Sequence, residues 1–489
     1  MRKIIFLFCF AVCVTLYAQP KVNWGDIQTS HHTGSDYIGV KTEDEQNLYM
    51  IKKDHIVRDQ DMWYLECISK QDKKIVYSKP LLTPVTPDKK PVKWNTIITL
   101  GTKLYLLSSY FDITGVFTVY ASSINTSTGD IQNTKLIYST TIRTKTTPFF
   151  HYSISPDKSK MLICPVPFDL QNNEAKIVDE NLQDIWKGLI TTPVTLNRIH
   201  YYDLLMDNNN NLIIYSTDYR KDDFPIDQKI ILFNASSLQG NILNITPPFE
   251  YILYSEKIKL YENNKLYFVG LLCDTSHAGR TGGVFSAFMD LDKQEFLNAG
   301  SAIFDEQKIN TLNSINKNEV GYFFGPYFLK NIFFRPNGTV SLLAEQETND
   351  YSTRQHISSL AFACNLSLRG YVNWLTLIPK YQVHAVKEYL SFVTGYDDAN
   401  IYLVFNDNYK NANLIGSDSP HCMDNLRECV TVMVSVDDYG TAKKKAFYPE
   451  DEASYLSVKP VLCSKLKNNV LLLFAEKENA IRLGEIMLK

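Results

Sequence analysis

The chain has 489 residues, a formal net charge of −3 and a hydrophobic content of 45%. Because acidic and basic residues nearly balance, the composition argues against nucleic acid or an anionic membrane surface as the main partner, since either requires a concentrated basic face. The aromatic content of 12%, together with many Thr, Ile and Val residues, favours β-sheet.

Residues 1–18 have the features of a signal peptide. Arg2 and Lys3 form a positive start, residues 4–16 are largely apolar, and Ala18 offers a small residue at the expected cleavage site. No later stretch is apolar for long enough to cross a bilayer as a helix. We therefore expect an exported protein in the periplasm, associated with the outer membrane or secreted, with no transmembrane segment in the mature chain.

Eight similar segments follow along the chain, each a polar turn that leads directly into a run of aliphatic residues. The clearest is FRPNGTVSLLA (334–344), in which Asn337 and Gly338 tolerate the positive φ angles of a tight turn. The interval between Leu266 and Val340 is the longest and predicts an insertion around residues 300–330. The first core residues after the eight turns are Leu48, Leu104, Leu162, Leu212, Leu266, Val340, Ile401 and Val470.

The intervals between these residues are 56, 58, 50, 54, 74, 61 and 69 residues. Periods of this kind, with four short strands in each, are typical of propeller blades. We therefore expect an all-β fold: a single β-propeller of seven or eight four-stranded blades over residues 19–489. Runs such as NVLLLFA (469–475) are apolar on both faces, which suits strands buried between two blades. Closure of the ring predicts that residues 35–53 share or adjoin a blade with residues 467–488.

The cysteines fall into two groups. Five of them lie in or beside apolar runs and are expected to be small core residues. Cys422 and Cys429 instead lie in a polar loop, where a short-loop disulfide is predicted for an exported protein. Zinc binding with His421 is the alternative, disfavoured by the spacing. A lipid anchor at Cys13 is disfavoured because the preceding residue, Val12, is not small. The five expected core cysteines are Cys67, Cys164, Cys273, Cys364 and Cys463.

Acidic turns suggest two further kinds of site, and neither pattern is complete. Asp207 begins a stretch that partly imitates a calcium loop, but Leu212 stands where that loop needs glycine, which favours a plain hairpin turn. Adjacent acids at a turn do not flank a glycosidic bond from opposite sides as hydrolysis requires. No metal, cofactor or catalytic residue is therefore predicted. The adjacent acids are Asp222-Asp223, Asp397-Asp398 and Asp437-Asp438.

The most unusual polar stretch follows the apolar run IYLVF. Its amides and its aromatic ring suit hydrogen bonding and stacking on a sugar or a peptide, which makes the stretch a candidate for an exposed binding loop. The favoured interpretation is that these amides satisfy their own backbone. Lys380 and Gln382 come one strand pair earlier and are expected to share the surface. The predicted binding residues are Lys380, Gln382, Asn406, Asp407, Asn408, Tyr409, Lys410 and Asn411.

Three segments resemble a family of exported proteins from Bacteroidota: YFLKNIFFRPNGTVSLLAEQ (327–346), NWLTLIPKYQ (373–382) and YLVFNDNYKN (402–411). The resemblance implies an envelope or secreted location in a Gram-negative cell and supplies no activity. We expect a non-enzymatic binding or scaffolding module of the cell envelope, with a protein or a glycan as partner. The alternative is a propeller enzyme acting on polysaccharide, of glycoside hydrolase or lyase type, with acids contributed by different blades.

Overall fold

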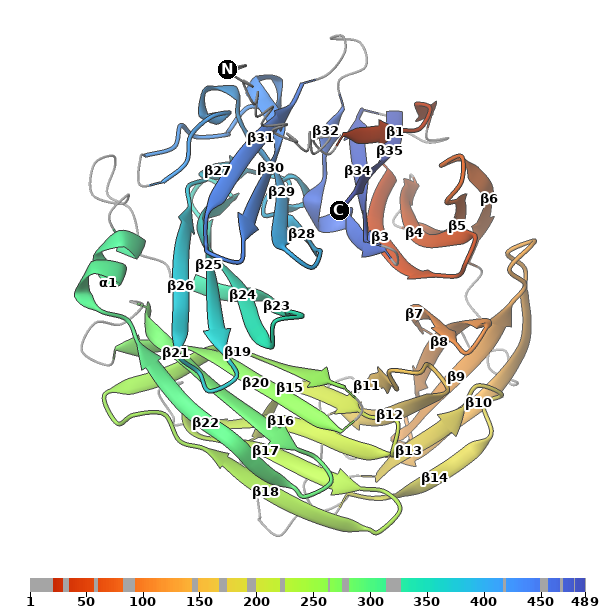
Figure 1. Cartoon of the computed structure of the whole chain (residues 1–489). Coiled ribbons are helices and arrows are strands. Elements are labelled where there is room, and N and C mark those ends of the chain that lie inside the picture. The colour runs from red at the N-terminus through yellow and green to blue at the C-terminus, as the bar shows by residue number, and fades with distance from the viewer. Residues whose placement is uncertain are drawn as a thin grey trace, which may run out of the picture.

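The computed structural model shows an all-β ring of eight blades around a common axis, which confirms the predicted β-propeller (Figure 1). The predicted signal peptide lies outside the residues that the structure describes. The structure describes residues 21–488 apart from 30–34, 57–59, 82–92, 143–147, 167–173, 191–198, 220–224, 263, 275–280, 314–326, 417–418, 449–455, 467–468 and 479.

The first four blades are formed by consecutive strands. Blade 1 comprises β3 (Ser35–Glu43), β4 (Asn47–Ile56), β5 (Gln60–Ser69) and β6 (Ile75–Pro80). Blade 2 comprises β7 (Lys93–Leu100), β8 (Lys103–Phe111), β9 (Val116–Ile124) and β10 (Ile131–Thr141). Blade 3 comprises β11 (Phe149–Ile154), β12 (Lys160–Val166), β13 (Glu174–Asp179) and β14 (Asp184–Leu189). Blade 4 comprises β15 (Ile199–Met206), β16 (Asn211–Tyr219), β17 (Pro225–Asn234) and β18 (Gln239–Ile245).

The next three blades keep this order. Blade 5 comprises β19 (Tyr251–Tyr261), β20 (Lys265–Asp274), β21 (Thr281–Asp290) and β22 (Glu295–Ile303). Blade 6 comprises β23 (Tyr327–Phe334), β24 (Thr339–Asp350), β25 (Gln355–Ser367) and β26 (Val372–Ile378), with β27 (Gln382–His384) added beside β25. Blade 7 comprises β28 (Val393–Tyr396), β29 (Asn400–Asn408), β30 (Cys429–Asp437) and β31 (Ala442–Phe447). A short helix, α1 (Glu306–Asn313), follows β22 in the region where the long interval predicts an insertion.

Blade 8 closes the ring with strands from both ends of the chain. The C-terminal part supplies β32 (Ser457–Val458), β33 (Ser464–Leu466), β34 (Val470–Lys477) and β35 (Ala480–Met487), and the N-terminal part supplies β1 (Val22–Trp24) and β2 (Gln28–Thr29), both paired with β35. Blade 1 packs directly on blade 8, where the rings of Tyr37 and Phe474 lie 4.9 Å apart. The predicted neighbourhood of residues 35–53 and 467–488 is confirmed.

The core lies between blades, so each of the eight interfaces has its own apolar cluster. Between blades 5 and 6, for example, Tyr267 of β20 packs its fully buried ring 5.9 Å from that of Phe334 of β23. A central strand such as β34 is therefore covered on both faces, which explains its continuous apolar sequence. Burying one large apolar side chain in such an interface stabilises the fold by about 1.5–3 kcal/mol.

The repeated polar turns cap their own backbone. Asp207, for example, accepts hydrogen bonds from the backbone N–H groups of Asn209 and Asn211 through Oδ1, each at 2.8 Å. The same geometry occurs at Asp397 and Asp437. Each blade is an antiparallel meander, so the turn between its first and second strands and the turn between its third and fourth strands lie on one face of the ring. We call this face the short-turn face. The connections between second and third strands and those between blades lie on the opposite face, which we call the long-connection face.

The cysteines follow the sequence analysis with one exception. Cys67, Cys164, Cys273 and Cys364 are buried core residues, and Cys463 is half-buried. Cys422 and Cys429 are not bonded to each other in the structure, and the predicted disulfide in the exported protein stays a prediction. The turn of 3₁₀ helix η4 (Leu426–Glu428) separates them, and Cys429 already begins β30, with its Sγ 3.8 Å from the hydroxyl of Ser457.

A pH-dependent stability is expected from Glu256 of β19, at the interface of blades 4 and 5. Burial raises its pKa to about 7, although Gln228 Nε2 donates to its carboxylate at 2.8 Å. Because the pKa is raised on folding, the native state binds the extra proton, and stability falls as pH rises from about 4.5 to 7. Because glutamine does not titrate, Glu256→Gln is expected to remove this fall of about 1–3 kcal/mol in the free energy of unfolding between pH 4.5 and 7.

Urea unfolding at several pH values measures this decline, with Glu45→Gln in an exposed turn as the matched control. An unchanged pH profile in Glu256→Gln would show that other groups cause the dependence.

Candidate functional site

The predicted binding residues lie at the interface of blades 6 and 7. Residues 379–392 run along the long-connection face between the two sheets. We call this segment the blade 6–7 connection. Its strand β27 pairs with β25 in the register Gln382↔Ser358, and it continues into the 3₁₀ helix η2 (Lys387–Tyr389). The backbone of Val383 also donates to Met423 O at 2.9 Å, which ties the connection to the loop between β29 and β30.

Most of the predicted binding residues are buried, so the prediction of an exposed loop is wrong for them. Lys380, Gln382, Asn406, Asp407 and Asn411 are 0% exposed, and Asn408 is 5% exposed. Strand β29 extends through Asn408, because its backbone pairs with β30 as far as Asn408↔Cys429. These polar residues therefore continue a buried strand. Only two of the predicted residues turn outwards: Tyr409 is 50% exposed, and Lys410 is exposed.

The Lys380 ammonium makes a fully buried ion pair with Glu345 of β24. Lys380 Nζ lies 2.5 Å from Glu345 Oε1 and also donates to Ser358 Oγ at 2.6 Å. Ser358 and Ser391 donate to Glu345 Oε1 and Oε2 at 2.6 and 2.5 Å. Burial alone would raise the pKa of Glu345, but the positive charges of Lys380 and Lys330 outweigh it and hold this pKa below its usual value.

Gln382 and Asn406 extend this network between the two blades. Gln382 accepts from Lys380 Nζ at 2.8 Å and donates through Nε2 to Asn406 O at 2.6 Å. The Asn406 amide donates to Val458 O at 2.7 Å, which reaches blade 8. Each residue thus satisfies backbone or side-chain groups that burial has removed from water, and leaving them unpaired would be costly.

A second buried ion pair lies beside it in blade 7. Asp407 Oδ2 is 2.6 Å from Lys444 Nζ of β31, and both side chains are at most 1% exposed. Asn411 Nδ2 donates to Asp407 Oδ1 at 2.7 Å and to His421 O at 2.8 Å. Asn411 and Asp407 therefore hold the start of the long loop against the sheet.

A cavity of about 200 Å³ opens directly above the first network on the long-connection face. Ser358 and Ser391 form its floor, and Phe328, 38% exposed, contributes an aromatic wall. On its side, His356 Nδ1 lies 2.7 Å from Asn349 Oδ1. Glu347, which also borders the cavity, is paired with Lys330 at 2.5 Å. The cavity thus combines hydroxyl, amide, imidazole and carboxylate groups with one aromatic ring.

This arrangement suits binding better than covalent chemistry. Ser358 and Lys380 are in contact, as in a serine nucleophile with a lysine base, but such a base must be neutral to accept a proton. Burial lowers the pKa of Lys380, and the Glu345 carboxylate 2.5 Å away opposes that shift. The Ser358 hydroxyl donates its proton to the same carboxylate rather than to the lysine, so the geometry does not prepare it as a nucleophile. The network instead holds the cavity floor rigid.

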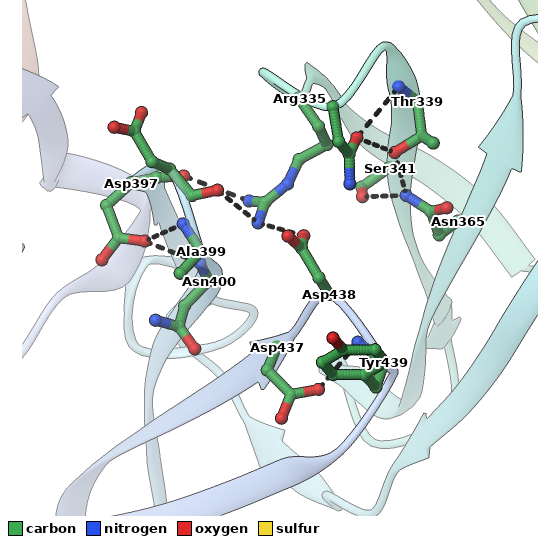
Figure 2. Close-up of polar contacts among 12 residues, drawn as sticks. Arg335, Thr339, Ser341, Asn365, Asp397, Ala399, Asn400, Asp437, Asp438 and Tyr439 are labelled. Atoms are coloured by element: carbon green, nitrogen blue, oxygen red, sulfur yellow. Dashed lines mark hydrogen bonds and ion pairs between the residues drawn. The ribbon is translucent and has the colours of Figure 1, made fainter.

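The adjacent acids at the turns form joints between blades on the short-turn face. Figure 2 shows buried Arg335 donating to the backbone carbonyls of Asp397 and Asp398, each at 3.2 Å, and to the Asp438 carboxylate at 2.6 Å. Asp437 caps its own turn by accepting from the N–H groups of Tyr439 and Thr441. The carboxylates of Asp397, Asp437 and Asp438 are therefore occupied by contacts within the fold, whereas Asp398 takes part through its backbone carbonyl. The third pair, Asp222-Asp223, lies outside the described residues.

Over the described ranges of the chain, no group of three or more His, Cys, Asp or Glu side chains is arranged to hold a metal ion. Within the same ranges, no helix is both long and apolar enough to cross a membrane.

Sequence reasoning found one half of the first network and missed the other. Lys380 and Gln382 were selected for their polar setting, whereas Glu345, Ser358 and Ser391 were not. A signal exists for Glu345, because it is a charged residue that follows the buried run VSLLA without a break. A carboxylate in such a position needs a buried cation. Lys380 supplies that positive charge, and it too follows an apolar run, LTLIP.

The comparisons with known proteins assign no family to the chain. No protein-family model matches it, and no curated protein matches it either. Several solved structures are similar to it at low identity. A polysaccharide lyase, Uly1, is 10% identical with a TM-score of 0.42, over 96% of this chain and 100% of that one. The WD40 domain of SCAP from fission yeast is 10% identical with a TM-score of 0.41, over 94% and 98%. The uncharacterized protein lmo1340 from Listeria monocytogenes EGD-e is 11% identical with a TM-score of 0.37, over 78% and 89%.

Proposed function

We propose that this protein is an exported binding module of the cell envelope that recognises a hydroxyl-rich ligand, a glycan unit, in the cavity at the blade 6–7 connection. The signal-peptide pattern of residues 1–18 and the resemblance to exported Bacteroidota proteins support a location in the periplasm, at the outer membrane or outside the cell. The chemistry of the cavity supports the ligand class.

One observation carries the proposal: a cavity of about 200 Å³, lined by both polar and apolar side chains, stands on two serine hydroxyls that hydrogen-bond to buried Glu345. Sugar hydroxyls both donate and accept, so they match side chains such as Asn349 and His356, and the apolar face of a sugar ring matches Phe328. Because Glu345 and Lys380 hold Ser358 and Ser391 in place, little conformational freedom is lost on binding.

Titration calorimetry with neutral hexoses, N-acetylhexosamines and hexuronic acids tests this proposal. At least one class is expected to bind the wild-type protein. Asn349→Ala and His356→Ala are each expected to weaken that binding roughly threefold to tenfold, the value of a single hydrogen bond. Both residues lie at the outer part of the cavity, so the fold should persist, as circular dichroism would verify.

Thr102→Ala, in an exposed turn on the short-turn face, is the matched control and should bind as the wild type does. The proposal fails when no sugar class binds, or when both cavity variants bind with unchanged affinity. New reducing ends or unsaturated products released from a polysaccharide by the wild-type protein would point instead to the propeller enzyme.

A further inference from the structure

Three lysines project from the innermost strands of the ring, away from the cavity. Lys257 and Lys259 are two residues apart on β19 of blade 5, so they lie on the same face of that strand. Lys465 lies on β33 of blade 8. All three are half-buried. The first strands of the blades surround the axis in Figure 1, and neighbouring first strands such as β19 and β23 contact one another there.

The contacts of Lys259 and Lys465 show that these side chains converge. Lys259 Nζ donates to Ile332 O of blade 6 at 2.7 Å and lies 5.6 Å from the centroid of the Phe334 ring. Lys465 Nζ lies 3.3 Å from the centroid of the Tyr396 ring in blade 7. Burial lowers the pKa of Lys259, and the positive charges of Lys465 and Lys257 lower it further.

Ring contacts place the two lysines around the same pair of aromatic side chains. Lys259 Nζ lies 6.0 Å from the centroid of the Phe333 ring, and that ring lies 5.0 Å from the ring of Tyr396, which Lys465 contacts. Blades 5 and 8 are not neighbours in the ring, because blades 6 and 7 lie between them. Side chains from the two blades therefore approach each other only across the axis. The ammonium groups of Lys259 and Lys465 thus face a shared space near the centre of the ring.

The three charges lack close partners of opposite sign. Among the residues that the structure describes, no carboxylate forms an ion pair with Lys257, Lys259 or Lys465, and Asp203 and Asp397 act on Lys257 and Lys465 only at longer range. Nearby Lys330 differs, because Glu345 and Glu347 neutralise it. Half-buried like charges that lie near one another repel, and that repulsion lowers the stability of the fold.

We propose that the axis of the ring at Lys257, Lys259 and Lys465 is a binding site for an oxyanion, a sulfate or carboxylate group that is either free or carried by an acidic glycan. A bound oxyanion would accept hydrogen bonds from the ammonium groups and remove their mutual repulsion. The aromatic rings of Phe334 and Tyr396 border the lysines and limit their hydration. This site is separate from the cavity at the blade 6–7 connection, and the inference does not rest on the proposed glycan recognition there.

The primary test titrates the protein with inorganic sulfate in the millimolar range and compares it with sodium chloride at equal ionic strength. Calorimetry is expected to show saturable binding of sulfate, and the unfolding temperature is expected to rise more in sulfate than in chloride. General exclusion of sulfate from protein surfaces also stabilises proteins, but it does not saturate at low concentration. Equal responses to both salts with no saturable heat would overturn the proposal.

The double variant Lys259→Met/Lys465→Met separates a ligand site from a structural role. Without sulfate at low salt, it is expected to unfold at a temperature equal to or above that of the wild type, because the repulsion is gone. Its sulfate affinity is expected to fall about tenfold or more. A lower unfolding temperature with an unchanged sulfate response would show that the lysines serve the fold alone. Lys443→Met, at an exposed position on β31, is the matched control and should behave as the wild type does.

A second arm distinguishes a free anion from an acidic glycan. A sulfated or uronate oligosaccharide is compared with its neutral counterpart and with inorganic sulfate. Tighter binding of the charged oligosaccharide than of sulfate, lost in the double variant, would identify a glycan-borne group. Binding of sulfate alone would identify a free anion. Should the double variant fail to fold, the wild-type titrations still decide whether the site exists.

Discussion

Lys380→Met is expected to lower the free energy of unfolding by about 3–5 kcal/mol, because the substitution leaves the Glu345 carboxylate buried without its main cation. Both side chains of this ion pair are fully buried, 2.5 Å apart. Lys330 remains 3.3 Å from the other carboxylate oxygen and offsets part of the loss. Urea unfolding followed by tryptophan fluorescence measures the difference. Adding Glu345→Gln to Lys380→Met should recover at least half of the lost stability, because the unpaired charge is then removed.

Lys410→Met is the matched control for that experiment. Lys410 is exposed, so its replacement should change the free energy of unfolding by less than about 0.5 kcal/mol. A loss below about 1 kcal/mol in Lys380→Met would contradict the role assigned to the ion pair, since breaking a buried pair normally costs several times as much.

Replacing Asn406, Asp407 and Asn408 together by alanine is expected to cost at least about 5 kcal/mol, which approaches the whole stability of many proteins. Loss of Asp407 leaves the Lys444 ammonium buried without its carboxylate partner, because the Lys444 side chain is 1% exposed. Loss of the two amides leaves buried carbonyl groups, such as Val458 O and Cys422 O, without their donors. The cooperative thermal transition seen by circular dichroism should shift strongly downwards or disappear.

The double variant Tyr409→Ala/Lys410→Ala changes the neighbouring exposed residues and should melt close to the wild type. If the triple variant also melts within a few degrees of the wild type, these polar side chains do not hold blades 7 and 8 together. That result would favour a role for these residues in binding rather than in the stability of the fold.

Much of the architecture could be predicted because it is encoded locally. Each polar turn such as Asp207–Asn210 caps its own backbone, and the aliphatic run after it needs no distant residue to become a strand. Regular recurrence of that unit predicts a propeller, and closure predicts which ends of the chain meet. The contribution of Val22–Trp24 and Gln28–Thr29 to blade 8 was not predicted, because these short segments pair only with a strand more than 450 residues away.

The candidate site could be predicted only in part, because polarity in a sequence does not reveal exposure. Asn406 and Asp407 look like loop residues, yet β29 continues through them and their partners lie in other strands. Lys380 meets a carboxylate 35 residues away in sequence, and Lys259 meets the charge of Lys465 from a blade three positions further around the ring.

The sequence by itself thus determined the strands, their repeat and the class of fold, since turn chemistry and apolar runs act between neighbouring residues. Only the tertiary structure decided which polar residues are buried as partners and which face a cavity or the axis. The physical reason is that a charge or an amide is satisfied by whatever group the fold brings within about 3 Å of it, at any separation along the chain.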